Sequence, residues 1–276
     1  MNPSADRPPY AESPTDRPPV SPTTVLAALL RRDARVARRE LPSFLVRTIM
    51  QPVLFLIVFG FLLPKMGFLR GDYTAALLPG IIAVSLTLSS VQSVALPMVQ
   101  DFGFTREIED RLLAPVPMRL IAIEKVIAGA LQGVLAALVV LPIGRLIMGP
   151  IPGLAWHNAG LALAVTLLGS TVFASLGLLM GTVVSAMQIG LMFSVVIAPM
   201  LMFGCVYYPW RGLDAVPAFQ YGVLVNPLVY VAEAMRGALT PQVPHMPLLV
   251  AVGAMVTLCA LFLVLGIRQF ERRAMG

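Results

Sequence analysis

Apolar positions along the chain gather into six long runs, separated by short segments that hold most of the charged residues. The runs cover residues 44–63, 73–99, 121–148, 157–184, 187–207 and 247–267. Each run offers the ~20 residues that an α-helix needs to cross the hydrocarbon core of a bilayer. The pattern therefore predicts an all-α integral membrane protein with six transmembrane helices, in a membrane domain over residues 42–276.

The segment before the first run divides into two parts. Residues 1–22 are rich in Pro, Ser, Asp and Arg and almost free of apolar side chains, which is typical of a disordered tail. Over residues 23–41, apolar residues recur at helical spacing, which predicts an amphipathic helix that ends before Pro42 and lies along the membrane surface. This helix is interpreted either as a topology signal with a lipid anchor or as a contact for a cytoplasmic partner. Its opposite face carries Arg31, Arg32, Arg35, Arg38 and Arg39.

Composition and charge agree with a membrane protein. Hydrophobic residues make up 58% of the chain and charged residues 12%, so lipid is expected to be the main solvent. The net charge of +6 does not indicate nucleic-acid binding, because the basic residues lie at the ends of apolar runs. Anionic membrane lipids are the expected partner there.

The distribution of basic residues also predicts the orientation. Most of the 20 Lys and Arg residues fall on one side of the predicted membrane, together with both termini. The positive-inside rule then places both termini in the cytoplasm, in a bacterial-type inner membrane or plasma membrane. The residues on the other side are Lys65, Arg70, Arg145, Arg211 and Arg236.

Motifs that would indicate an enzyme are missing from the sequence. It has no GxxxxGK[ST] phosphate loop, no HExxH, no GxSxG and no pair of carboxylates within an apolar run. The middles of the runs contain no ionisable residue, which argues against a gradient-driven carrier. We therefore expect no catalytic residue, cofactor site or metal site in this chain. Polar residues such as Gln92 either hydrogen-bond between helices or line a substrate path.

The connection between the second and third runs mixes charges of both signs with apolar residues. Over residues 104–114, apolar side chains recur on one helical face, and Pro115 ends the pattern. Such a short helix could dock into a groove on a soluble partner, or it could be an ordinary solvated connector. The residues that could make the contact are Phe104, Arg106, Glu107, Glu109, Asp110 and Arg111.

A further motif lies before the last apolar run, where residues 226–239 read NPLVYVAEAMRGAL. Together with the basic amphipathic helix and the segment REIEDRLLAPVPMRLIAIEKVIAG, it resembles the ATP-binding-cassette type-2 permeases. The resemblance covers essentially the whole chain after residue 22. The motif residues that carry it before the last run are Asn226, Pro227, Tyr230, Glu233, Arg236 and Gly237.

The resemblance implies an ATP-driven exporter whose ATPase is a separate chain. Residues 104–114 would be the coupling helix and residues 23–41 an interface helix, both against the ATPase, while residues 213–239 would form short re-entrant helices in the outer leaflet. Two identical or related permeases would pair, and each would bind one of two ATPase subunits, which hold the ATP and Mg. The exported substrate would be hydrophobic or amphipathic, such as a drug, a lipid or a lipid-linked glycan.

A substrate path would lie between the first, second and fifth helices of the paired permeases. Apolar side chains of the fifth helix would contribute to its lining, although simple helix packing explains them equally well. The alternative function is a membrane-embedded anchoring or assembly subunit without a transport role. The candidate path residues are Gln92, Met192, Phe193, Met200, Met202 and Phe203.

Overall fold

The computed structural model describes Arg31 and residues 50–68, 73–102 and 117–275. Every regular element in these ranges is a helix. Arg31 is helical and exposed. The predicted tail over residues 1–22, the rest of the amphipathic helix over residues 23–41 and the coupling helix over residues 104–114 lie outside the described residues, so these three assignments remain predictions.

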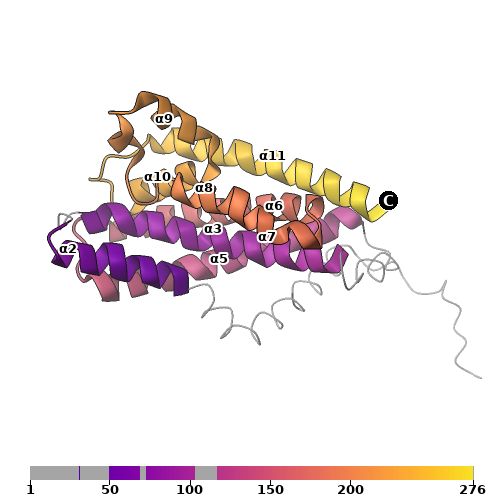
Figure 1. Cartoon of the computed structure of the whole chain (residues 1–276), viewed down its shortest axis with the longest axis horizontal. Helices are drawn as coiled ribbons and strands as arrows, with labels where there is room; N and C mark the ends of the chain where they lie inside the picture. Colours follow the sequence, from indigo (N-terminus) through magenta and orange to yellow (C-terminus); the bar gives the residue numbers. More distant parts are fainter. Residues whose placement is uncertain (1–30, 32–49, 69–72, 103–116, 276) are drawn as a thin grey trace, which may run out of the picture.

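Within the described ranges, four helices are long and apolar enough to cross a membrane. They are α3 (Tyr73–Gln100), α5 (Met118–Met148), α6 (Ala159–Val183), which follows the 3₁₀ turn η3 (Trp156–Asn158), and α11 (Leu248–Met275). They lie lengthwise beside one another, with α3 in contact with α5 and α6, and α6 in contact with α11 (Figure 1). These helices confirm the second, third, fourth and sixth predicted spans.

Helix α3 forms the centre of this bundle, whereas α11 lies at its edge. In the most apolar stretch of α3, 94% of the residues are buried, against 11% for α11. A helix that is buried on all sides inside a membrane protein packs against other helices, while an apolar helix at the edge can face lipid. The centre of the protein is therefore made by α3 with its neighbours α5, α6 and α10 (Pro227–Leu239).

The first and fifth predicted spans are shorter in the described residues. The first is described from Met50 to Lys65 and includes η1 (Leu56–Leu62) and α2 (Leu63–Lys65). The fifth consists of η4 (Ala186–Gln188), α7 (Ile189–Met192), η5 (Phe193–Ile197) and α8 (Ala198–Met202). At 1.5 Å per residue, Ile189–Met202 is about 20 Å long, less than the ~30 Å of a hydrocarbon core.

Prolines accompany the π-helical turns, and a backbone reversal follows the end of the fifth span. Both η1 and η5 are π-helical, and each is followed by a proline, Pro64 or Pro199, whose missing N–H group cannot bond to the carbonyl one turn earlier. The predicted fifth span extends to residue 207, but the helix ends at Met202 and Cys205 adopts a positive φ of 51°. A left-handed backbone at a non-glycine residue interrupts a helix, so the predicted end of this span is wrong.

Short helices fill the segment before α11, as the family resemblance implies for residues 213–239. They are η6 (Trp210–Leu213), α9 (Pro217–Gly222), η7 (Val223–Val225) and α10 (Pro227–Leu239). Prolines stand at the first position of α9 and α10, where the missing N–H group costs no hydrogen bond. Nearly every side chain of α10 is buried, because this helix packs between α3, α6 and α11. Re-entry into the outer leaflet stays a prediction.

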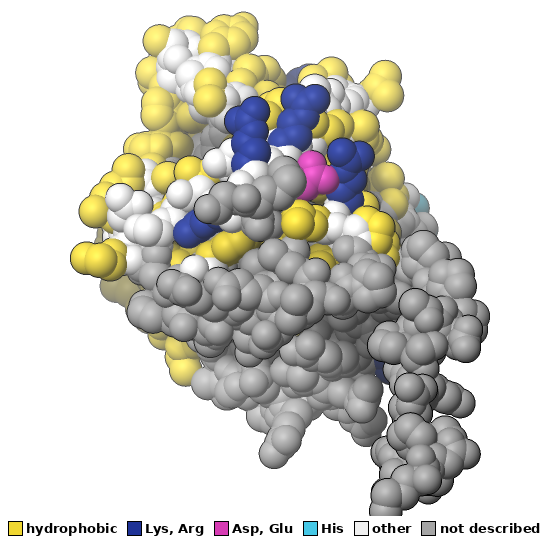
Figure 2. Space-filling view, turned by 90° about the vertical axis from the view of Figure 1, so that its right-hand side faces the viewer, with side chains coloured by type: hydrophobic (Ala, Val, Ile, Leu, Met, Phe, Trp, Pro, Cys, Tyr) yellow, Lys and Arg dark blue, Asp and Glu magenta, His cyan; other side chains and the backbone are white. Residues whose placement is uncertain are grey.

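The two ends of the molecule differ in character. Helices α9 and α10 gather at one end, which we call the hub end, and the carboxyl end of α11 lies at the opposite, basic end (Figure 1). Lys and Arg side chains gather over the basic end, with an acidic side chain among them (Figure 2). The basic residues there include Arg119 at the start of α5 and Arg268, Arg272 and Arg273 at the end of α11.

Candidate functional site

The motif at residues 226–239 begins with a helix cap that joins two elements. The Asn226 side-chain oxygen accepts a hydrogen bond of 2.9 Å from the backbone N–H of Leu228, which caps the start of α10. The Asn226 side-chain amide donates a bond of 2.7 Å to the Met200 carbonyl in α8. Tyr230, one turn further on, donates its hydroxyl to the Leu224 carbonyl at 2.7 Å. The start of α10 is thereby fixed against both η7 and the fifth helix.

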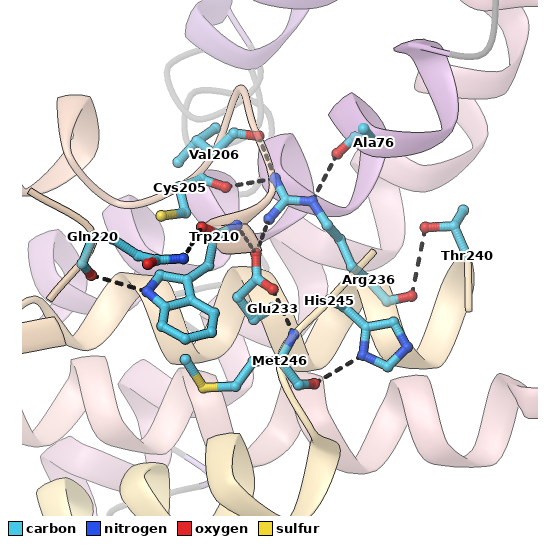
Figure 3. A network of polar contacts seen from close by, with 10 residues as sticks. All are labelled: Ala76, Cys205, Val206, Trp210, Gln220, Glu233, Arg236, Thr240, His245 and Met246. Atoms are coloured by element: carbon cyan, nitrogen blue, oxygen red, sulfur yellow. Dashed lines mark hydrogen bonds and ion pairs between the residues drawn. The ribbon is translucent and has the colours of Figure 1, made fainter. Parts of the chain in front are cut away.

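A buried ion pair forms the centre of the hub end (Figure 3). The guanidinium of Arg236 and the carboxylate of Glu233 lie 2.6 Å apart, and neither side chain has any exposed surface. Arg236 also donates to the backbone carbonyls of Ala76, Cys205 and Val206. A charge buried to this degree is tolerated when it is paired and hydrogen-bonded, and each of the three guanidinium nitrogens of Arg236 has an acceptor.

Glu233 accepts hydrogen bonds from backbone N–H groups on the other side of the network (Figure 3). One of its oxygens accepts the N–H of Trp210 at 2.9 Å, and the other accepts the N–H of Met246 at 2.8 Å. The pair therefore ties together four segments that are distant in sequence: the start of α3, the 205–210 loop, α10 and the segment before α11. We call Glu233, Arg236 and these backbone partners the hub.

The 205–210 loop also requires a glycine in α3. A Cβ atom at Gly80 would collide with the backbone carbonyl of Val206, which is one of the acceptors of Arg236. Close approach of two backbones needs the missing side chain of glycine at this position. The Trp210 indole N–H then donates to the Gln220 carbonyl at 2.9 Å and fastens α9 to the same loop.

An apolar cavity of about 430 Å³ opens between α8 and the short helices. Phe203 packs edge to face against Phe219 beside it, with ring centroids 5.6 Å apart. Of the candidate path residues, Met200 and Phe203 line this cavity. The residues outside its lining are Gln92 and Phe193, which are half-buried, Met192, which is buried, and Met202, which is exposed.

A second group of contacts lies at the basic end. The guanidinium of Arg273 donates to the Thr182 carbonyl at 2.7 Å and to the Val184 carbonyl at 3.1 Å, at the end of α6. It also lies 4.7 Å from the centre of the Phe102 ring. Glu271 pairs with the exposed Arg119 at 2.6 Å. The end of α11 thus contacts residues on both sides of the connection 103–116.

Most of the predicted partner-facing residues lie outside the described part of the chain. This holds for Arg32, Arg35, Arg38, Arg39, Phe104, Arg106, Glu107, Glu109, Asp110 and Arg111. Only Arg31 of this set is described, and it is exposed. The role of the set in binding an ATPase stays a prediction.

Sequence reasoning missed two features of the charged residues. Arg236 was counted among the basic residues of the outer side, but it is fully buried in the hub. Lys125, near the start of the run 121–148, is buried in α5 beside Glu124, with the two charged groups 3.8 Å apart. The signal that could have found both is a charge surrounded by apolar residues at helical spacing, since such a charge has to face the protein interior.

Comparison with known proteins finds a matching protein family and similar transport permeases. Residues 24–240 match the family described as ABC-2 type transporter. The chain is 30% identical over 227 residues to the inner membrane transport permease YadH of Escherichia coli (strain K12), an alignment that covers 79% of this chain and 84% of the relative. The inner membrane transport permease YadH of Shigella flexneri matches to the same extent.

Proposed function

This chain belongs to the ABC-2 type transporter family, and from that premise we propose that it is the membrane-spanning permease subunit of an ATP-driven exporter. Its relatives are transport permeases of the inner membrane, and its four long apolar helices suit a protein that crosses a membrane several times. The observation that carries the proposal is the family match over residues 24–240. The exported substrate is a hydrophobic or amphipathic molecule.

The ATP is bound and hydrolysed with Mg by a separate ATPase subunit, present in two copies. The absence of a GxxxxGK[ST] loop from the sequence supports this division of labour. The ATPase contacts the segment 104–114 and the arginine face of residues 23–41, on the cytoplasmic side. Both termini lie on that side, which agrees with the basic residues at the end of α11.

The second permease packs against the first and fifth helices. These two predicted spans, 44–63 and 187–207, expose large apolar side chains on the described surface. The exposed residues include Leu54, Phe61, Leu191 and Val195. The cavity beside Met200 and Phe203 lies between the fifth helix and the short helices, which suits the outer part of a path for an apolar substrate. ATP binding would shift the pair between two states through the coupling helices.

Association with the ATPase tests this proposal. The tagged chain is cross-linked in its native membranes, purified in mild detergent and analysed by mass spectrometry. The proposal expects a protein with a GxxxxGK[ST] loop in about equal amount, together with a second permease. Recovery of the chain with no such ATPase after cross-linking would favour the anchoring or assembly subunit instead.

A further inference from the structure

A second cavity lies near the hub end, on the side of the molecule formed by α5 and α6. It has a volume of about 120 Å³. Its walls come from Leu138 and Leu141 of α5 and from Ala162 and Leu163 of α6, and α3 and α10 also contribute to the lining. Leu138 and Leu163 are each about half exposed. The cavity therefore opens between two membrane helices toward their lipid-facing surface.

The cavity is unsuited to water. Its lining contains two polar side-chain groups, the Thr166 hydroxyl and the Trp156 indole N–H. The Thr166 hydroxyl already donates to the Ala162 carbonyl at 2.7 Å. A buried water needs two to four polar partners, whereas apolar cavities of ~150 Å³ stay dry and take up hydrocarbon ligands. The occupant that the lining fits is a hydrocarbon chain.

The positively charged side chain of Arg145 lies beside the cavity. Arg145 lies four residues beyond Leu141 on α5, so it is one helical turn closer to the hub end on the same face. Its guanidinium is 5.3 Å from the centre of the Trp156 ring, which itself lines the cavity. This contact keeps the charge beside a residue of the cavity wall, and the exposed guanidinium can donate to a phosphate.

We propose that this cavity is a binding site for an anionic phospholipid. One acyl chain enters between α5 and α6, and the headgroup phosphate meets Arg145 above the Trp156 ring. Tryptophan and arginine at the level of lipid headgroups are common anchors in membrane proteins, and a basic residue beside a gap between helices selects anionic headgroups. The site depends on the membrane location of the chain and not on its proposed transport activity.

Native mass spectrometry of the full-length chain in detergent tests the site. The protein is titrated with phosphatidylglycerol and with phosphatidylcholine of the same acyl chains, and the fraction with one bound lipid is measured. We expect about fivefold tighter binding of phosphatidylglycerol, the effect of one basic residue near an anionic headgroup. Glycerol phosphate, which lacks an acyl chain, should not compete.

Three variants complete the test. Arg145→Gln should abolish the preference for phosphatidylglycerol, and Arg211→Gln, which removes another exposed arginine at the hub end, should leave the preference unchanged. Ala162→Leu, which fills the cavity, should weaken the binding of both lipids equally. The proposal is overturned if the wild-type chain shows no preference, if Arg145→Gln keeps the preference, or if Ala162→Leu binds both lipids as the wild type does.

Discussion

Replacing Arg236 by Met should strongly destabilise the protein, because Arg236 is the residue that holds the hub together. The variant would leave the Glu233 carboxylate buried without its cation and would leave the loop carbonyls of Cys205 and Val206 without their donor. Removal of one partner from a buried pair costs about 3–5 kcal/mol. We therefore expect a loss of this size in the free energy of unfolding.

The double variant Glu233→Met with Arg236→Met sharpens this prediction. Buried ion pairs can often be replaced by apolar residues with little loss, because no charge is left behind. In this protein the replacement would also strand the N–H groups of Trp210 and Met246, which Glu233 accepts. Each unsatisfied buried group costs about 1–3 kcal/mol, so the double variant should not regain wild-type stability.

Equilibrium unfolding in mixed micelles, followed by tryptophan fluorescence, measures both variants. Trp210 is a member of the network and one of the two tryptophans of the chain, so unfolding of the hub contributes to the signal. Arg268→Met serves as the control, because Arg268 is exposed on α11, and it should unfold like the wild type. The reasoning is refuted if Arg236→Met stays within about 1 kcal/mol of the wild type or if the double variant recovers its stability.

Three further predictions concern other parts of the chain. Reversing the three acidic charges of segment 104–114 should weaken binding of the ATPase in pull-down assays without reducing membrane insertion, and normal binding would contradict the coupling-helix assignment. Arg273→Met should lower the free energy of unfolding by about 1–3 kcal/mol and speed hydrogen exchange at the end of α6, because the Thr182 and Val184 carbonyls lose their donor. The control Arg272→Met removes an exposed side chain and should change neither the stability nor the exchange. Gly80→Ala should lower the free energy of unfolding by about 1–3 kcal/mol, because its Cβ meets the Val206 carbonyl; unchanged denaturation would mean that the loop can shift.

The long helices could be predicted from the sequence because hydrophobic length is a strong local signal. An apolar run of spanning length coincides with each of the four long helices, α3, α5, α6 and α11. The fifth run was misjudged at its end, since the residues after Met202 are as apolar as those before it. The helix stops there because of a backbone reversal at Cys205 and bonds from the hub to the following loop, and these are tertiary contacts.

The motif at residues 226–239 can be recognised from the sequence, but the buried hydrogen-bond network that it forms cannot be predicted from it. The sequence reveals that Glu233 and Arg236 are one helical turn apart, which permits an ion pair. It does not reveal the backbone groups of Ala76, Trp210 and Met246, because those lie between 13 and 160 residues away along the chain. The cavity beside Arg145 cannot be found from the sequence for the same reason, as its walls come from α3, α5, α6, α10 and the segment 154–156.

Dependence of ATP hydrolysis on this chain tests the central claim most directly. The co-purified ATPase is assayed alone and together with this chain in lipid nanodiscs, with and without charge reversal in segment 104–114. Our account predicts that the wild-type chain changes the rate of ATP hydrolysis and that the reversed chain does not. If hydrolysis is the same with and without the chain, the protein is not the permease of an ATP-driven exporter with that ATPase.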